Sequence, residues 1–157
     1  MTAKILDGKA LAEEIRGEVA TGVAEMQQRH GVTPGLAAVL VGDDPASAIY
    51  VRNKRRACDE VGMFSDSVLL PANSTNEQVL ATVQSLNDDP RFHGILVQLP
   101  LPPQVDERLI IESLDPAKDV DGLHPFNVGK LVQGRADFVP GPPAGIQQIL
   151  LRNGHDP

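Results

Sequence analysis

Three short apolar runs alternate with segments of helical periodicity, and this alternation restricts the fold more than any other feature of the sequence. The clearest run is Gly35–Val41, which is bounded by Pro34 and Gly42. An uninterrupted apolar run of this length is typical of a strand buried on both faces, as in a parallel sheet. Runs at 67–70 and 94–99 predict two further strands.

Helical segments surround these predicted strands. Apolar residues at three- and four-residue steps predict helices over 9–29, from Pro45 to about Val61, near 106–113 and over 143–154. Ser74 and Glu77 have the spacing of a capping box, which predicts another helix start. The stretch 115–134 shows little periodicity and is expected to be mostly loop. The order predicts a three-layer α/β/α domain with a mainly parallel sheet, in which ligands bind at the carboxyl ends of the strands.

Charge and composition exclude several function classes. The 157 residues include 14 Lys+Arg and 21 Asp+Glu, a net charge of −7, which argues against a nucleic-acid or membrane-surface partner. Cys58 is the only cysteine, so an internal disulfide or a cysteine-based zinc site is excluded, and we expect no metal. No apolar run reaches membrane-spanning length and no signal peptide is evident, so we expect a soluble cytoplasmic protein.

The first candidate for chemistry is the pair Tyr50 and Lys54. Residues four apart share one face of a helix, so a ring and an amine would lie side by side near the end of the first strand. Such a pair could stack on a flat ligand and transfer protons to or from it. Arg52, Arg55 and Arg56 lie close in sequence, so the alternative is a solvated basic helix face.

The second candidate is Gln98, which follows the third strand and precedes Pro100 and Pro102. Its amide offers two donors and one acceptor at the edge where ligands bind. The alternative is a plain strand end followed by a rigid turn.

The third candidate is the segment 118–122, which contains Asp119 and Asp121. Two carboxylates in a loop could hold a cation or accept paired N–H groups from a heterocycle. The alternative is an Asx turn, and His124 nearby is read as a structural histidine.

Five motifs together resemble the bifunctional methylenetetrahydrofolate dehydrogenase/methenyltetrahydrofolate cyclohydrolase family. They are VGDDPAS at 41–47, YVRNK at 50–54, VQLPLP at 97–102, KDVDGLHP at 118–125 and NVGKL at 127–131, in the family's order and approximate spacing. The resemblance implies oxidation of 5,10-methylenetetrahydrofolate with NADP, followed by hydrolysis of the methenyl cation to 10-formyltetrahydrofolate. It also implies a place in the one-carbon metabolism that supplies purine biosynthesis.

The resemblance implies a role for each matched residue. Lys54 activates water or relays its proton, Gln98 assists Lys54, and Asp121 binds the pterin as the third catalytic residue. Tyr50 packs on the aminobenzoyl ring of the substrate. The remaining substrate contacts implied by the motifs are Ser47, Val97, Leu99 and Pro100.

The resemblance also implies a domain organisation. Residues 1–140 correspond to the folate-binding catalytic domain, and 141–157 to a linker helix toward a Rossmann-type NADP domain and a homodimer interface that this chain lacks. No G-x-G-x-x-G turn is present, so no cofactor-binding residue is assigned. Pro142 stands where the family usually has a threonine, and the missing helix cap is expected to cost about 1 kcal/mol.

Two other functions compete with this reading. One is a non-catalytic folate-binding or dimerisation module, which would be indifferent to loss of Lys54. The other is an unrelated α/β hydrolase that uses Asp119, Asp121 and a metal ion, and that chelators would inhibit.

Overall fold

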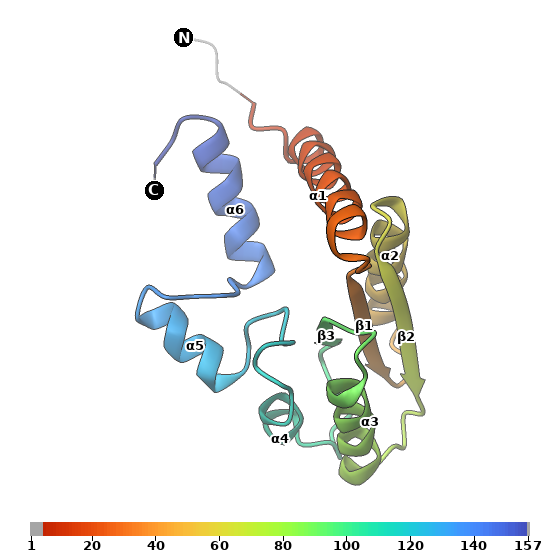
Figure 1. Ribbon diagram of the computed structural model, residues 1–157. Helices are drawn as coiled ribbons and strands as arrows, with labels where there is room; N and C mark the ends of the chain where they lie inside the picture. Colours follow the sequence, from red (N-terminus) through yellow and green to blue (C-terminus); the bar gives the residue numbers. More distant parts are fainter. Residues whose placement is uncertain (1–4, 157) are drawn as a thin grey trace.

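The computed structural model describes residues 5–156 and confirms an α/β fold (Figure 1). Its elements in chain order are α1 (Gly8–His30), β1 (Gly35–Val41), α2 (Pro45–Glu60), β2 (Phe64–Leu70), α3 (Asn76–Asp88), β3 (Gly94–Val97), α4 (Glu107–Glu112), α5 (Pro125–Val132) and α6 (Gly141–Arg152). Among these residues, no helix has both the length and the apolar character that a membrane span requires.

The three strands form a parallel sheet in the order β2-β1-β3. The central strand β1 has the predicted bounds, and all but one of its residues are buried. The strand β2 begins at Phe64, three residues before the predicted start, because an edge strand alternates exposed and covered residues and shows no continuous apolar run. The strand β3 ends at Val97, and the peptide bond between Leu99 and Pro100 is cis.

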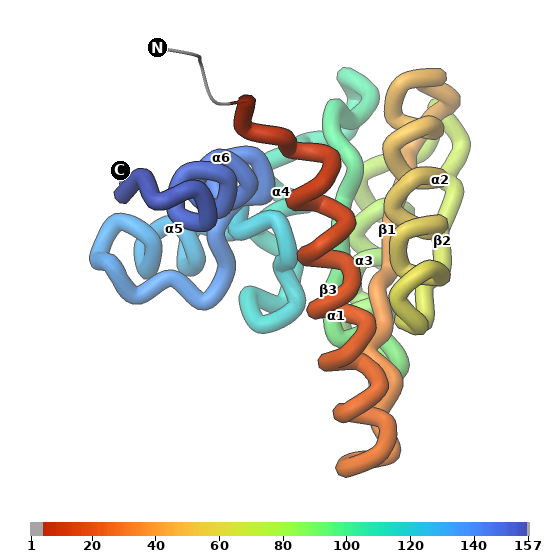
Figure 2. Tube along the Cα trace, turned by 90° about the horizontal axis from the view of Figure 1, so that it is seen from above, coloured from red at the N-terminus to blue at the C-terminus, as the bar shows by residue number. Residues whose placement is uncertain are grey.

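Helices cover both faces of the sheet, which confirms the predicted layers (Figures 1 and 2). Alternate residues of β1 point to opposite faces. Ala37, Val39 and Val41 pack with apolar residues of α3 and α4. Ala38 and Leu40 pack with Val51 of α2 and Leu96 of β3 on the other face.

Three local expectations were wrong. The segment expected to be loop contains α5, which begins at Pro125 with His124 as its N-cap. The capping box of α3 is formed by Thr75 and Gln78, one residue later than predicted, because Thr75 has the extended backbone of a cap. The helix α6 begins at Gly141, so the position without a capping side chain is Pro140 and not Pro142.

The segment 118–121 lies beside β3. Asp119 forms a parallel bridge with Ile95, and the Ile95 amide donates to the Lys118 carbonyl at 2.7 Å. A Cβ atom on Gly94 would lie 2.4 Å from Cγ1 of Val120, so only glycine allows this close approach. This one bridge and the close packing on Gly94 fix the segment against β3.

The helix α6 lies beside the N-terminal part of α1 (Figures 1 and 2). Arg152 donates to Glu14 at 2.6 Å and to both carboxylate oxygens of Glu18 at 2.6 and 2.8 Å. No residue of α6 is buried, and these ion pairs join its last turn to α1.

Candidate functional site

The inward face of α2 carries Lys54. The buried residues of this helix are Ser47, Val51 and Cys58, and Lys54 falls on the same stripe, three residues after Val51 and four before Cys58. Lys54 is half-buried, whereas the neighbouring arginines at 52, 55 and 56 are exposed. Lys54 therefore does not belong to the solvated basic face that was the alternative interpretation.

Tyr50 lies one turn before Lys54 on α2 and is 62% exposed. An aromatic ring this open to solvent makes no large contribution to the core, because most of its area remains in water. Its position leaves the ring available to a flat ligand beside the amine of Lys54.

Asp121 approaches the same region from the far side of β3. Asp119 is the bridge partner of Ile95 in β3, and Asp121 follows two residues later, in the turn where the Gly122 N–H donates to the Asp119 carbonyl at 3.4 Å. Desolvation by burial raises the pKa of the Asp121 carboxyl, the Lys54 ammonium lowers it, and the charge of Asp119 raises it. The structure thus brings Lys54 and Asp121 close enough for one charge to act on the other.

Gln98 lies at the end of β3 with one amide atom unsatisfied. Its backbone N–H donates to the Val39 carbonyl at 2.8 Å, and its Nε2 donates to the Leu99 carbonyl at 2.8 Å. Its Oε1 is buried without a hydrogen-bond partner. A buried acceptor without a donor costs free energy, so a donor supplied by a ligand would bind there favourably.

The other predicted substrate contacts differ in accessibility. The Ser47 side chain is buried at the start of α2, and its backbone N–H donates to Asp44 at 2.7 Å. Val97 belongs to the core on the α3 side, which leaves only its backbone for a ligand. Leu99 is half-buried and Pro100 is exposed.

Asp119 has a structural role that sequence reasoning missed. Its carboxylate is 1% exposed and accepts hydrogen bonds from the His124 amide at 2.8 Å and from Asn127 Nδ2 at 2.9 Å. These bonds fix the start of α5 against the sheet edge. Asn127 gave no signal of this role, although proline at the first helical position after His124 marks a helix start.

A metal-dependent site at the two aspartates finds no support in this geometry. Within residues 5–156, no group of three or more His, Cys, Asp or Glu side chains is arranged to hold a metal ion. Asp119 already has two donors, so the hydrolase hypothesis would need a carboxylate that the fold uses elsewhere.

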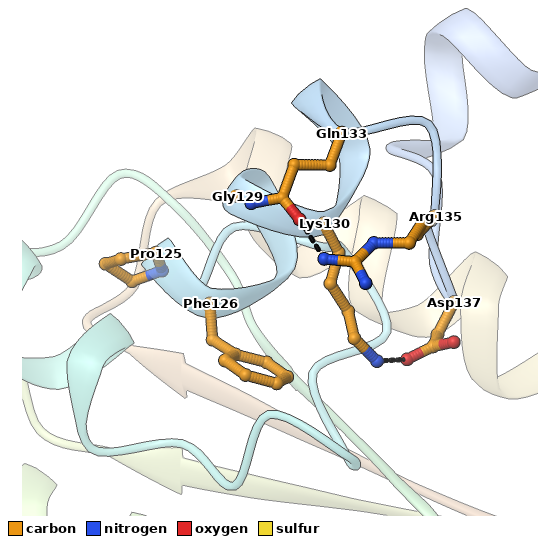
Figure 3. Close-up of a pocket in the computed structure, with 7 residues that line it drawn as sticks. All are labelled: Pro125, Phe126, Gly129, Lys130, Gln133, Arg135 and Asp137. Carbon is orange, nitrogen blue, oxygen red and sulfur yellow. Dashed lines mark hydrogen bonds and ion pairs between the residues drawn. The ribbon is translucent and has the colours of Figure 1, made fainter.

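A cavity of about 680 Å³ lies apart from these residues, on α5 and the segment that follows it (Figure 3). Lys130 lies 5.1 Å from the centre of the Phe126 ring and is ion-paired with Asp137. Arg135 donates to Gln133. Because both cations already have partners, this cavity offers a ligand no free charge.

The fold and the site define an α/β domain with a lysine, a desolvated aspartate and an unsatisfied amide at the carboxyl edge of a parallel sheet. The family model for the tetrahydrofolate dehydrogenase/cyclohydrolase catalytic domain matches residues 6–121. The chain belongs to this family, as its motifs predicted.

Relatives and solved structures agree with this assignment. The bifunctional protein FolD 2 of Geobacter sulfurreducens is 54% identical over 154 residues, which are 98% of this chain and 54% of that protein. The FolD dehydrogenase/cyclohydrolase structure from Campylobacter jejuni superposes with a TM-score of 0.92 at 43% identity, over 96% of this chain and 53% of that one.

The description of a third similar structure names a cofactor. The Trypanosoma brucei FolD structure, described as complexed with NADP cofactor and inhibitor, has a TM-score of 0.93 at 38% identity and covers 98% of this chain and 53% of that one. The chain therefore spans about half the length of the relatives it matches.

Proposed function

We propose that this chain supplies the folate-side catalytic groups of a methylenetetrahydrofolate dehydrogenase and methenyltetrahydrofolate cyclohydrolase. The observation that carries the proposal is the proximity of Lys54 to the desolvated carboxyl of Asp121, within a chain of this family. Residues 1–140 would form the folate-binding domain, and 141–157 a helix that connects it to a second domain. The whole enzyme would be a cytoplasmic homodimer.

The site suits the hydrolytic step. The methenyl carbon is cationic, and the water that adds to it must lose a proton as the carbon–oxygen bond forms. Lys54 as a neutral amine would accept this proton, and the Asp121 carboxylate would hold the resulting ammonium; groups positioned for such transfer contribute about 10²- to 10⁴-fold to a rate. Asp121 would also accept the adjacent N–H and NH₂ groups of the pterin, and Tyr50 would stack on the aminobenzoyl ring.

NADP would supply hydride acceptance in the oxidation, but the described residues do not fit this cofactor. The turn between β1 and α2 has a single glycine, and the helix start is occupied by Asp44, whose carboxylate accepts from the Ser47 amide at 2.7 Å. A carboxylate in that place repels a phosphate that would otherwise bind a helix N-terminus. We therefore derive no step through the dinucleotide.

Loss of Lys54 tests the proposal. The variant Lys54→Met should reduce the hydrolysis of methenyltetrahydrofolate by about 10²-fold or more, because the proton acceptor is removed. The measurement is the decay of methenyltetrahydrofolate absorbance, compared with the unmodified chain. Lys9→Met is the matched control, since Lys9 is exposed at the start of α1.

The alternative function gives the opposite result. A non-catalytic folate-binding or dimerisation module would bind tetrahydrofolate and show the same slow decay with and without Lys54. Equal decay in the Lys54→Met variant and the unmodified chain would overturn the catalytic proposal.

A further inference from the structure

A second cavity lies on the opposite flank of α2 from Tyr50 and Lys54. It has a volume of about 450 Å³ and is lined by residues of α2, by Leu40, by Gly42 and the carboxylate of Asp43 in the turn after β1, and by Ser67 and Leu69 of the edge strand β2. The helix contributes Ala48, Val51, Arg52 and Arg55, which follow the i, i+3, i+4, i+7 pattern of a single stripe. This volume lies within the range of small-molecule sites, about 300–1,000 Å³.

The two arginines of this cavity have no partner. Within residues 5–156, neither the Arg52 nor the Arg55 side chain makes a hydrogen bond, an ion pair or a ring contact. The other arginines of this part of the chain pair with a carboxylate or an amide oxygen. Two free guanidinium groups at one cavity are unexpected in a chain of net charge −7, where carboxylates outnumber cations.

The walls of the cavity add an apolar requirement. Leu69 is 67% exposed on β2, and Leu40 and Val51 form the buried floor beneath it. An exposed leucine beside two exposed arginines suits a ligand that has an apolar body and an anionic end. A guanidinium group binds two oxygens of a carboxylate or of a phosphate in the same way, so either anionic group would be recognised here.

We propose that this cavity, the α2–β2 cavity, binds a small organic anion whose carboxylate or phosphate contacts Arg52 and Arg55 and whose apolar body packs on Leu69. The site lies across α2 from the proposed folate site and does not depend on the proposed function. A ligand here would contact the same helix that holds Lys54.

Phenyl phosphate and benzoate are the probes, and each is titrated into the 157-residue chain while backbone amide chemical shifts are followed. Saturable shifts are expected at Gly42, Ala48 and Ser67, with smaller shifts at Asp121. Inorganic phosphate and phenol should each bind at least about tenfold more weakly than phenyl phosphate. Inorganic phosphate lacks the apolar ring, and phenol lacks the anionic group. Comparison of phenyl phosphate with benzoate shows which anion the site prefers.

The matched variants are Arg52→Gln, Arg55→Gln and Arg56→Gln, which remove the same charge from neighbouring positions of α2. The first two should weaken phenyl phosphate by about tenfold each, as expected for loss of a charge-assisted contact. Arg56→Gln should leave binding within about twofold, because Arg56 pairs with Glu60 and does not line the cavity.

Two results would overturn the proposal. One is a shift map centred on Lys54, Gln98 and Asp121, which the unmodified chain alone can show and which requires no variant to fold. The other is equal weakening by all three substitutions, since this would mean that only the overall charge of the helix attracts the anion.

Discussion

Two aspartates separated by one residue have opposite environments. Asp119 is buried and accepts two hydrogen bonds, whereas the Asp121 carboxyl is desolvated and has a raised pKa. A carboxylate that loses water without gaining donors is destabilised in its charged form. The difference separates a residue that holds the fold from a residue available to a ligand.

This environment gives a pH-dependent prediction for Asp121→Asn. The folded-state pKa of Asp121 lies above its ordinary value of 3.8, so its favourable contribution to stability is complete below that value and is lost as pH rises through the folded-state pKa. The Asn variant should therefore have a higher Tm than the unmodified chain at pH 7. The gain should shrink as the pH approaches 4.

Thermal unfolding at several pH values measures this effect, with Asp43→Asn as a control at an exposed position. If Asp121→Asn lowered Tm at pH 7, the attraction to Lys54 would outweigh desolvation, and the stated direction would be incorrect.

Sequence reasoning reached some of these residues and not others, for a physical reason. The spacing of Tyr50 and Lys54 places them on one helix face, because helical periodicity is local. The bridge between Asp119 and Ile95, which brings Asp121 near β3, is a long-range pairing, and no local pattern encodes it. The burial of Asp119 could not be predicted for the same reason, because its donors lie at the start of α5 and within it.

At the scale of elements, the segment 118–121 connects several parts of the molecule. Lys118 donates to the carbonyls of Leu86, Asn87 and Asp89 at the end of α3. Val120 packs against the cluster that includes Val51 of α2. The helix α5 begins a few residues after this segment and was not predicted.

Gly94→Ala tests the contact between this segment and β3. The new methyl group would meet Val120 at 2.4 Å, so the variant should lose about 1–3 kcal/mol of unfolding free energy through overpacking. Urea unfolding measures the loss.

Two further variants separate overpacking from a general effect of glycine replacement. Val120→Ala combined with Gly94→Ala should recover part of the stability, because it removes the opposing methyl groups. Gly17→Ala in α1 should be neutral or stabilising, since nothing lies within 4 Å of the added atom. No recovery in the double variant would contradict the proposed clash.

At the scale of the whole molecule, α6 is attached to the rest of the chain without a single buried residue. Ile146 and Leu151 of this helix are 62% and 43% exposed. Glu18 and Glu14 raise the pKa of Arg152, so this guanidinium remains charged and paired at any physiological pH.

Arg152→Ala should therefore loosen α6 selectively. Amide hydrogen exchange should become faster across Gly141–Arg152 and remain unchanged in β1, because local opening follows the loss of local contacts. Arg108→Ala is the control, since its ion pair with Glu112 lies within one helix. Unchanged exchange in α6 would show that Arg152 does not hold it.

The four consecutive residues 118–121 also set how freely this site can be redesigned. Lys118 donates to the end of α3, Asp119 accepts from α5, and Val120 packs with the cluster that includes Val51 of α2. Only the Asp121 carboxyl is left for a ligand. Inserting or deleting one residue here would misplace several of these side chains together, because each contacts a different element. Substitutions that alter ligand preference should therefore be tolerated at solvent-exposed Tyr50 and hardly at all within residues 118–121.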